Sequence, residues 1–219
     1  MIISIDGPAG SGKSTVASLL SKKIGFIHFN SGSLYRAITA HLISNDIDVN
    51  TLDNSSILEN ISLEVKFDNT VQHTYVNGVD YTNDLRKPNV STLTPVVSVN
   101  KKVRALVDKT QREIAKNNNL VIDGRDIGSY VFPSAEIKFY LDCDIKERAK
   151  RRQKELNNKY SLKDIEKMLF ERDEYDKNKK VAPLIIPKNA FIIDSTNLTI
   201  EQVVNKMFTH VKQFKLAHN

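Results

Sequence analysis

The sequence predicts an α/β fold in which a parallel sheet, flanked by helices, carries a phosphate-binding loop. Two observations lead to this prediction. Short β-branched or apolar runs alternate with segments whose apolar residues recur at helical spacing. A glycine-rich stretch lies between the first such run and the first such segment. Alternating helices and buried strands indicate a parallel sheet, because parallel strands need crossover connections.

The alternation begins at the first residues of the chain. Ile2–Ile5 is a β-branched run, and the segment after it has helical spacing. Phe26–Phe29 is typical of a second strand. Ser31 is expected to cap the next helix, whose apolar face contains Leu34 and Ile38.

An antiparallel insertion is expected at residues about 60–82. Apolar and charged residues alternate over Leu63–Phe67, and a short strand at Thr74–Val76 leads into Asn77-Gly78. This dipeptide suits a two-residue hairpin turn, because both of its residues tolerate positive φ. The insertion therefore forms a small sheet of its own.

The parallel pattern resumes after the insertion and continues to the last residues. The expected elements are a helix at Lys101–Lys116, strands at Leu120–Ile122 and Ile137–Leu141, a charged helical stretch at about 144–177, a strand at Ala190–Ile193 and a helix from about Thr199.

The composition is that of one globular domain with an insertion. The chain has 219 residues, more than one domain of roughly 150 and fewer than two. Hydrophobic residues make up 40% and charged residues 26%, which excludes disorder, collagen and coiled coil for the whole chain. Cys143 is the only cysteine, so no intrachain disulfide or zinc-thiolate cluster can form. With no basic leader and no apolar run of membrane length, we expect a cytoplasmic protein that enters no membrane.

The net charge of +6 attracts phosphates in general. Nucleic-acid binders tend to cluster basic residues beside aromatic ones, whereas here basic and acidic residues are mixed and aromatics are only 7%, with no Trp. The sign of the charge alone does not distinguish nucleic acid, nucleotides and no particular ligand, but this distribution of residues leads us to expect no nucleic-acid partner.

The glycine-rich stretch fits the phosphate-loop pattern G-x-x-x-x-G-K-S/T without exception, between a strand and a helix as the pattern requires. Its glycines let the backbone curl around an anion, so that N–H groups and the helix amino end face the phosphates. Lys13 is expected to reach the β- and γ-phosphates of ATP, and the Ser14 hydroxyl to coordinate Mg²⁺. The expected nucleotide-binding residues are Gly7, Pro8, Ala9, Gly10, Ser11, Gly12, Lys13, Ser14 and Thr15.

Arginines that follow several strands favour a kinase among the phosphate-loop proteins. Arg36 follows the second strand, Arg125 and Asp126 follow the third, and Arg148 and Arg151 open the helix after the fourth. Ligands of an open parallel sheet bind beyond the carboxyl ends of its strands, where these groups can converge. A kinase needs such convergence because it works by positioning and charge neutralisation. We expect Arg148 and Arg151 to reach the transferring phosphoryl group together with Lys13, although each arginine alone also fits a solvated surface charge.

Further motifs occur along the whole chain. In order they are I-D-G-P-A-G-S-G-K-S-T near the start, N-S-G-S-L-Y-R at Asn30–Arg36, I-D-G-R-D-I-G-S-Y-V-F-P at Ile122–Pro133, E-R-D-x-x-D at Glu171–Asp176, V-A-P-L at Val181–Leu184 and D-S-T at Asp194–Thr196. In order and spacing, these blocks resemble the bacterial cytidylate kinase family.

The resemblance implies a nucleoside-monophosphate kinase fold with a parallel five-stranded sheet, a small antiparallel insertion and a short lid. Residues 1–219 would form one domain: a core at about 1–35, 100–147 and 180–219, a monophosphate-binding region at about 36–99 and a lid at about 148–160. The implied reaction is Mg·ATP with CMP or dCMP giving ADP and the diphosphate. The implied enzyme is a cytoplasmic monomer without an obligate protein partner.

The resemblance also implies contacts to the acceptor. Arg36, Arg125 and Arg172 would bind its phosphate or sugar, Asp176 its sugar hydroxyls, and Arg104 with Asp126 its base. Ser31 and Lys179 complete the implied substrate contacts. Cytosine offers acceptors at O2 and N3 and an amino group at C4, which suit arginine donors and a carboxylate respectively.

Two positions depart from the family pattern. Pro95 stands where the family usually has a base-contacting serine, and Thr94 beside it is a candidate substitute. Lys179 stands where the family has an arginine, so it supplies charge without a bidentate fork. The open alternatives are a kinase of the same fold for another acceptor, such as UMP/CMP, shikimate or gluconate, and a phosphate-loop switch or nucleic-acid-stimulated ATPase.

Overall fold

The computed structural model describes residues 1–54, 56–68 and 71–218. The chain divides into two compact units, and each is described by itself. The first unit consists of Met1–Ile27 and Asn119–Asn219, and the second of His28–Asn118.

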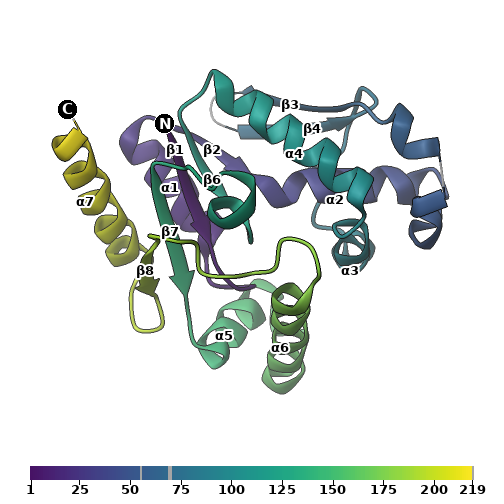
Figure 1. The fold of residues 1–219 in the computed structure, drawn as a ribbon. Helices are drawn as coiled ribbons and strands as arrows, with labels where there is room; N and C mark the ends of the chain where they lie inside the picture. Colours follow the sequence, from purple (N-terminus) through teal and green to yellow (C-terminus); the bar gives the residue numbers. More distant parts are fainter. Residues whose placement is uncertain (55, 69–70, 219) are drawn as a thin grey trace. The chain divides into compact units, whose positions relative to one another are not determined.

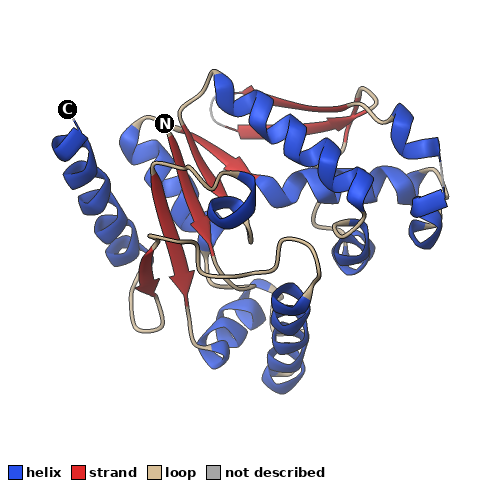
Figure 2. Cartoon of the chain, in the orientation of Figure 1, coloured by secondary structure: helices blue, strands red, loops and turns tan. Residues whose placement is uncertain are grey.

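A five-stranded sheet includes four strands of the first unit, and one edge strand begins at Ile27 and continues into the second unit. Its strands are β1 (Ile2–Asp6), β2 (Ile27–Asn30), β6 (Leu120–Asp123), β7 (Ile137–Asp142) and β8 (Phe191–Asp194), in the order β2-β6-β1-β7-β8. The central strand β1 pairs in parallel with both β6 and β7, and β7 pairs in parallel with β8 (Figure 2). The predicted parallel sheet is confirmed.

The described part of the first unit contains the α-helices α1 (Lys13–Ile24), α5 (Ile145–Glu155), α6 (Leu162–Asn178) and α7 (Ile200–His218), and a π-helical turn at Ile127–Val131. The yellow helix α7 in Figure 1 packs with α1. An apolar cluster of this unit joins the central strands to these two helices through buried side chains that include Ile5, Leu20, Phe139 and Met207. Among the described residues, no helix is both long and apolar enough to cross a membrane.

The charged stretch predicted at about 144–177 is helical, but a turn that was not predicted divides it into α5 and α6. Asn157 and Asn158 between the two helices have φ angles of 52° and 58°, which end the first helix. Ser161 then caps α6, since its side chain accepts a hydrogen bond from the backbone N–H of Asp164. Cap residues inside a run of charged residues mark this break.

The second unit combines a small sheet with helices. It contains α2 (Ser31–Ser44), two 3₁₀ turns (Val49–Asn54 and Ser56–Asn60), β3 (Leu63–Asp68), β4 (Val71–Val76), β5 (Val79–Asp80), α3 (Pro88–Val97) and α4 (Lys101–Lys116). Strands β3, β4 and β5 form an antiparallel sheet. Asn77 and Gly78 have φ angles of 51° and 77°, as the predicted hairpin turn requires.

Two details of the second unit differ from the predictions. The residue that caps α2 is Asn30, whose Oδ1 accepts from the backbone N–H of Ser33, while Ser31 is the first residue of the helix. Helix α3 was not predicted, because it contains Pro95 and proline removes a helical hydrogen bond. Pro88 at its first turn favours helix initiation instead.

Candidate functional site

The phosphate loop connects β1 to α1 and depends on glycine. Gly7 has a φ of 151°, and a Cβ at this position would lie 2.2 Å from the carbonyl oxygen of Leu141 on the neighbouring strand. Gly12 has a φ of 90° and directly precedes the first turn of α1. A side chain at Gly7 would therefore push the loop off the sheet. The loop leads directly into the amino end of α1, where backbone N–H groups can bind an anion.

Lys13 lies over this loop. Its Nζ donates to the Pro8 carbonyl oxygen at 2.6 Å and to Ser11 Oγ at 3.3 Å, and the residue is only 5% exposed. Burial, followed by the positive charge of Arg125, holds the pKa of Lys13 well below its usual value. A bound polyphosphate would favour the charged form of this lysine.

Ser14 and Asp123 bring two hard oxygen groups together at the start of α1. Ser14 Oγ donates to Asp123 Oδ2 at 2.5 Å. Sequence reasoning assigned Ser14 to Mg²⁺ but gave Asp123 no role, although its place at the end of a buried strand before Gly124 was a usable signal. A hydroxyl and a carboxylate fit Mg²⁺, which prefers oxygen ligands.

Asp6, the last residue of β1, was also missed. Its carboxylate is fully buried and accepts from the backbone N–H of Ile127 at 2.8 Å and of Gly128 at 2.7 Å. Burial raises the pKa of Asp6 to about 7, against the opposing effect of these two hydrogen bonds. The carboxylate fixes the π-helical turn Ile127–Val131, which begins directly after Asp126.

Arg125, Arg172 and Asp176 form an ion-pair cluster. The Nε atoms of Arg125 and Arg172 lie 2.9 Å and 3.1 Å from Asp176 Oδ2. The Asp176 side chain is 3% exposed, whereas those of Arg125 and Arg172 are 26% and 30% exposed. Burial raises the pKa of Asp176, but Arg125, Arg172 and Lys179 together outweigh burial and lower it. Four of the predicted acceptor residues therefore gather at the end of α6.

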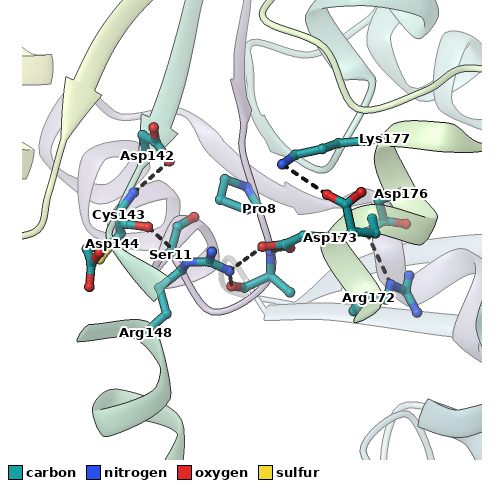
Figure 3. A network of polar contacts seen from close by, with 12 residues as sticks. Pro8, Ser11, Asp142, Cys143, Asp144, Arg148, Arg172, Asp173, Asp176 and Lys177 are labelled. Atoms are coloured by element: carbon teal, nitrogen blue, oxygen red, sulfur yellow. Dashed lines mark hydrogen bonds and ion pairs between the residues drawn. The ribbon is translucent and has the colours of Figure 1, made fainter. Parts of the chain in front are cut away.

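Arg148 and Arg151 lie on α5. Arg148 Nη1 contacts Asp173 Oδ2 at 2.6 Å and the Ala9 carbonyl oxygen at 2.8 Å (Figure 3). Arg151 donates to Glu147 and to the Ser195 carbonyl oxygen. Protein groups thus engage both guanidinium groups here, and their predicted catalytic role stays a prediction.

Ser31, Arg36 and Arg104 belong to the second unit. Ser31 is buried in the first turn of α2. Arg36 Nη1 donates to the Leu85 carbonyl oxygen at 3.0 Å and to Ser91 Oγ at 2.8 Å. Arg104 is buried on α4, with its guanidinium carbon 5.8 Å from the centre of the Tyr35 ring. The predicted acceptor residues are therefore divided between the two units, with Asp126 in the first.

Thr94, the suggested substitute for the missing serine, is buried in α3. Its Oγ1 donates to the Val90 carbonyl oxygen at 2.6 Å. Only the lone pairs of this hydroxyl remain for a ligand, whereas Pro95 beside it has no side-chain polar atom.

The parallel sheet, the glycine-rich loop and the lysine over it define a phosphate-loop protein. A solved shikimate kinase from Bacteroides thetaiotaomicron has the same fold, with a TM-score of 0.51 and 13% sequence identity over 97% of this chain and 98% of that chain.

Sequence comparison identifies the family. The family model for cytidylate kinase matches residues 3–213. The cytidylate kinase of Caldicellulosiruptor saccharolyticus is 42% identical over 209 residues, which cover 94% of this chain and 92% of the relative. That of Caldanaerobacter subterraneus is 40% identical over 214 residues, 96% of this chain and 94% of the relative. The chain belongs to the cytidylate kinase family, and the family that its motifs predicted is confirmed.

Proposed function

We propose that this protein transfers the γ-phosphoryl group of Mg·ATP to CMP or dCMP, giving ADP and CDP or dCDP. The observation that carries the proposal is the phosphate loop, folded under Lys13, in a chain of the cytidylate kinase family. Phosphoryl transfer requires positioning and charge neutralisation, and the polar groups around this loop supply both.

The donor side consists of residues close to the loop. Backbone N–H groups at the start of α1 bind the phosphates, and the Lys13 ammonium stabilises charge that develops during transfer. Ser14 Oγ and the Asp123 carboxylate would hold Mg²⁺, which supplies neutralisation of phosphate charge when bound. Thr15 and the other loop residues from Gly7 complete the nucleotide contacts.

The residues proposed for the acceptor are the charged cluster of the first unit and Ser31, Arg36 and Arg104 of the second. Arg125, Arg172 and Lys179 bind the monophosphate, and Asp176 accepts from sugar hydroxyls. Arg36 and Ser31 act on the same substrate. The cluster supports this role because its two guanidinium groups keep exposed surface while they share one buried carboxylate.

Arg104 and Asp126 select cytosine. Arg104 donates to O2 and N3 of the ring, and the Asp126 carboxylate accepts from the C4 amino group. Uracil presents N3–H and a C4 oxygen, so both contacts become unfavourable. Binding uracil would leave buried polar groups unsatisfied.

Arg148 and Arg151 act on the transferring phosphoryl group when residues about 148–160 close as a lid. Closure excludes water, which would otherwise compete with CMP as acceptor. The enzyme is a cytoplasmic monomer that needs neither nucleic acid nor a protein partner.

An ADP-release assay against a panel of acceptors tests the proposal. CMP and dCMP should support release, whereas UMP, shikimate and gluconate should give little above the acceptor-free rate. Single-stranded DNA is added in parallel. ADP release that responds to DNA and not to CMP would contradict the proposal and favour a nucleic-acid-stimulated ATPase.

A further inference from the structure

A buried ion pair supports the phosphate loop from the helices that follow it. Arg148 on α5 and Asp173 on α6 are 7% and 6% exposed, and Arg148 Nη1 lies 2.6 Å from Asp173 Oδ2. The expected substrate contacts include Arg172 and Asp176 but leave Asp173 without a function. A buried pair has a desolvation cost, so it gives weak evidence of a contribution to stability alone.

The ion pair forms hydrogen bonds with both backbone polar groups of Ala9, a residue of the phosphate loop. The backbone N–H of Ala9 donates to Asp173 Oδ1 at 3.1 Å, and its carbonyl oxygen accepts from Arg148 Nη1 at 2.8 Å. Arg148 Nε also donates to the Cys143 carbonyl oxygen at 2.9 Å, which anchors the guanidinium to the end of β7 (Figure 3). The loop conformation at Ala9 is therefore set by side chains far away in sequence.

Packing supports the same connection. Ala9 lies against a small apolar cluster made by Ala149, Ile165 and Leu169 of the two helices. A Cβ at Gly10 would lie 3.6 Å from Arg148 Cβ and 3.7 Å from Leu169 Cδ2, so the next loop residue also lies close to them.

We propose that Asp173 is a positioning residue that holds the phosphate loop in its ATP-binding conformation, with Arg148 as its partner. The proposal rests on the proposed function only in taking ATP as the loop's ligand. A loop held in its binding conformation before ATP arrives loses less entropy on binding and directs its N–H groups at the phosphates. Asp173 itself contacts no substrate in this role.

The direction in which ATP affinity changes when Asp173 is removed distinguishes a positioning residue from a residue that only places a charge near the site. Removal of a carboxylate close to a polyphosphate site relieves repulsion. If Asp173 were only a nearby negative charge, Asp173→Ala would therefore bind ATP more tightly. A positioning residue predicts weaker binding, because the Ala9 N–H loses its acceptor and Arg148 its counter-ion. Asp173→Asn keeps an acceptor for that N–H and should lose less affinity than Asp173→Ala.

The experiment uses the Mg²⁺ complex of the β,γ-imido analogue of ATP. Calorimetry measures the Kd of each protein variant for this complex, and thermal unfolding gives the Tm of each variant. We expect Asp173→Ala to weaken binding between about tenfold and a hundredfold. The double variant Arg148→Met/Asp173→Leu leaves no unpaired charge, so its Tm should exceed that of Asp173→Ala while its affinity stays low. Because it also removes a proposed phosphoryl contact, support for positioning comes from Asp173→Ala and Asp173→Asn, which keep Arg148. The exposed pair Lys167 and Glu171 on α6 gives the control variant Lys167→Gln/Glu171→Gln, which should bind as the wild type does.

Wild-type or tighter affinity in folded Asp173→Ala would overturn the proposal, and so would wild-type affinity in the double variant. If neither variant folds, Asp173→Asn decides: weakened binding supports positioning, and unchanged binding contradicts it. The readout needs no turnover, so failure to phosphorylate CMP would refute the proposed function without altering this result. With CMP as acceptor, the KM for ATP should rise more than that for CMP.

Discussion

The phosphate loop and the arginine cluster around Asp176 both face anions in the proposed reaction, yet they are held in different ways. Lys13 is buried, and its Nζ donates to Pro8 and Ser11, which lie five and two positions before it in the loop. Arg125 and Arg172 keep about a quarter to a third of their side-chain surface exposed, and both form ion pairs with the Asp176 carboxylate of α6. Short-range contacts hold Lys13 over the loop, whereas an acceptor phosphate must compete with Asp176 for the guanidinium groups of Arg125 and Arg172.

The largest expected effect comes from the loop lysine. Lys13→Ala should lower kcat by about 10²- to 10³-fold or more, because charge that develops on the phosphoryl group loses its nearest cation. Circular dichroism should show an unchanged fold. Lys22 is exposed near the end of the same helix, and Lys22→Ala is the control that should keep wild-type turnover. Near-normal turnover in Lys13→Ala would contradict the mechanism.

The second largest expected effect concerns base selectivity, and it tests Asp126, the residue that precedes the π-helical turn. The wild type should prefer CMP to UMP by about 10²-fold or more in kcat/KM, since uracil leaves buried polar groups unpaired. Asp126→Asn should narrow this ratio, because an amide can donate to the uracil O4 that a carboxylate repels. Equal use of CMP and UMP by the wild type would refute the roles of Arg104 and Asp126. Pro95, which replaces the base-contacting serine of the family, would then be the first position to substitute.

Two buried carboxylates in the first unit should give opposite pH behaviour. The pKa of Asp6 rises from 3.8 to about 7 on folding, so the folded state binds the extra proton and stability should fall as pH rises between these values. Asp6→Asn should remove this decline from the profile of unfolding free energy against pH.

Asp176 is the matched comparison, because its pKa is lowered. Its contribution to stability is present above the ordinary carboxyl pKa and is lost only as pH falls below it. Asp176→Asn should therefore change the acid end of the profile and leave its slope near neutral pH unaltered. Identical profiles for the Asp6→Asn variant and the wild type between pH 4 and 7 would show that Asp6 does not titrate as described.

The smallest expected effect concerns Lys179, the point charge at the edge of the arginine cluster. Lys179→Ala should raise the KM for CMP a few-fold and change the KM for ATP less, while Lys179→Arg should be neutral or mildly favourable. Lys180→Ala is the control, since Lys180 is exposed beside it. An alanine variant that alters only ATP kinetics, or neither substrate, would make Lys179 a solvated surface residue.

The contrast between loop and cluster also explains what sequence reasoning could predict. The loop is contiguous, and its glycines, lysine and serine identify it without any knowledge of the fold. Asp6 and Asp173 have partners 121 and 164 positions away, so the local pattern gives no sign of their contacts. The partner of Asp123 is 109 positions away, and its place at the end of a buried strand was the one local signal for it. The turn between α5 and α6 was missed because asparagines with positive φ look like other polar residues in a charged segment.

One measurement tests the central claim directly, because it follows the transferred group itself. ATP labelled at the γ-phosphorus is incubated with Mg²⁺, CMP and the protein, and the products are separated. The account predicts that the label appears in CDP in an amount equal to the ADP formed, and that Lys13→Ala abolishes this transfer on the same timescale. Label found in inorganic phosphate, with CMP recovered unchanged, would contradict it.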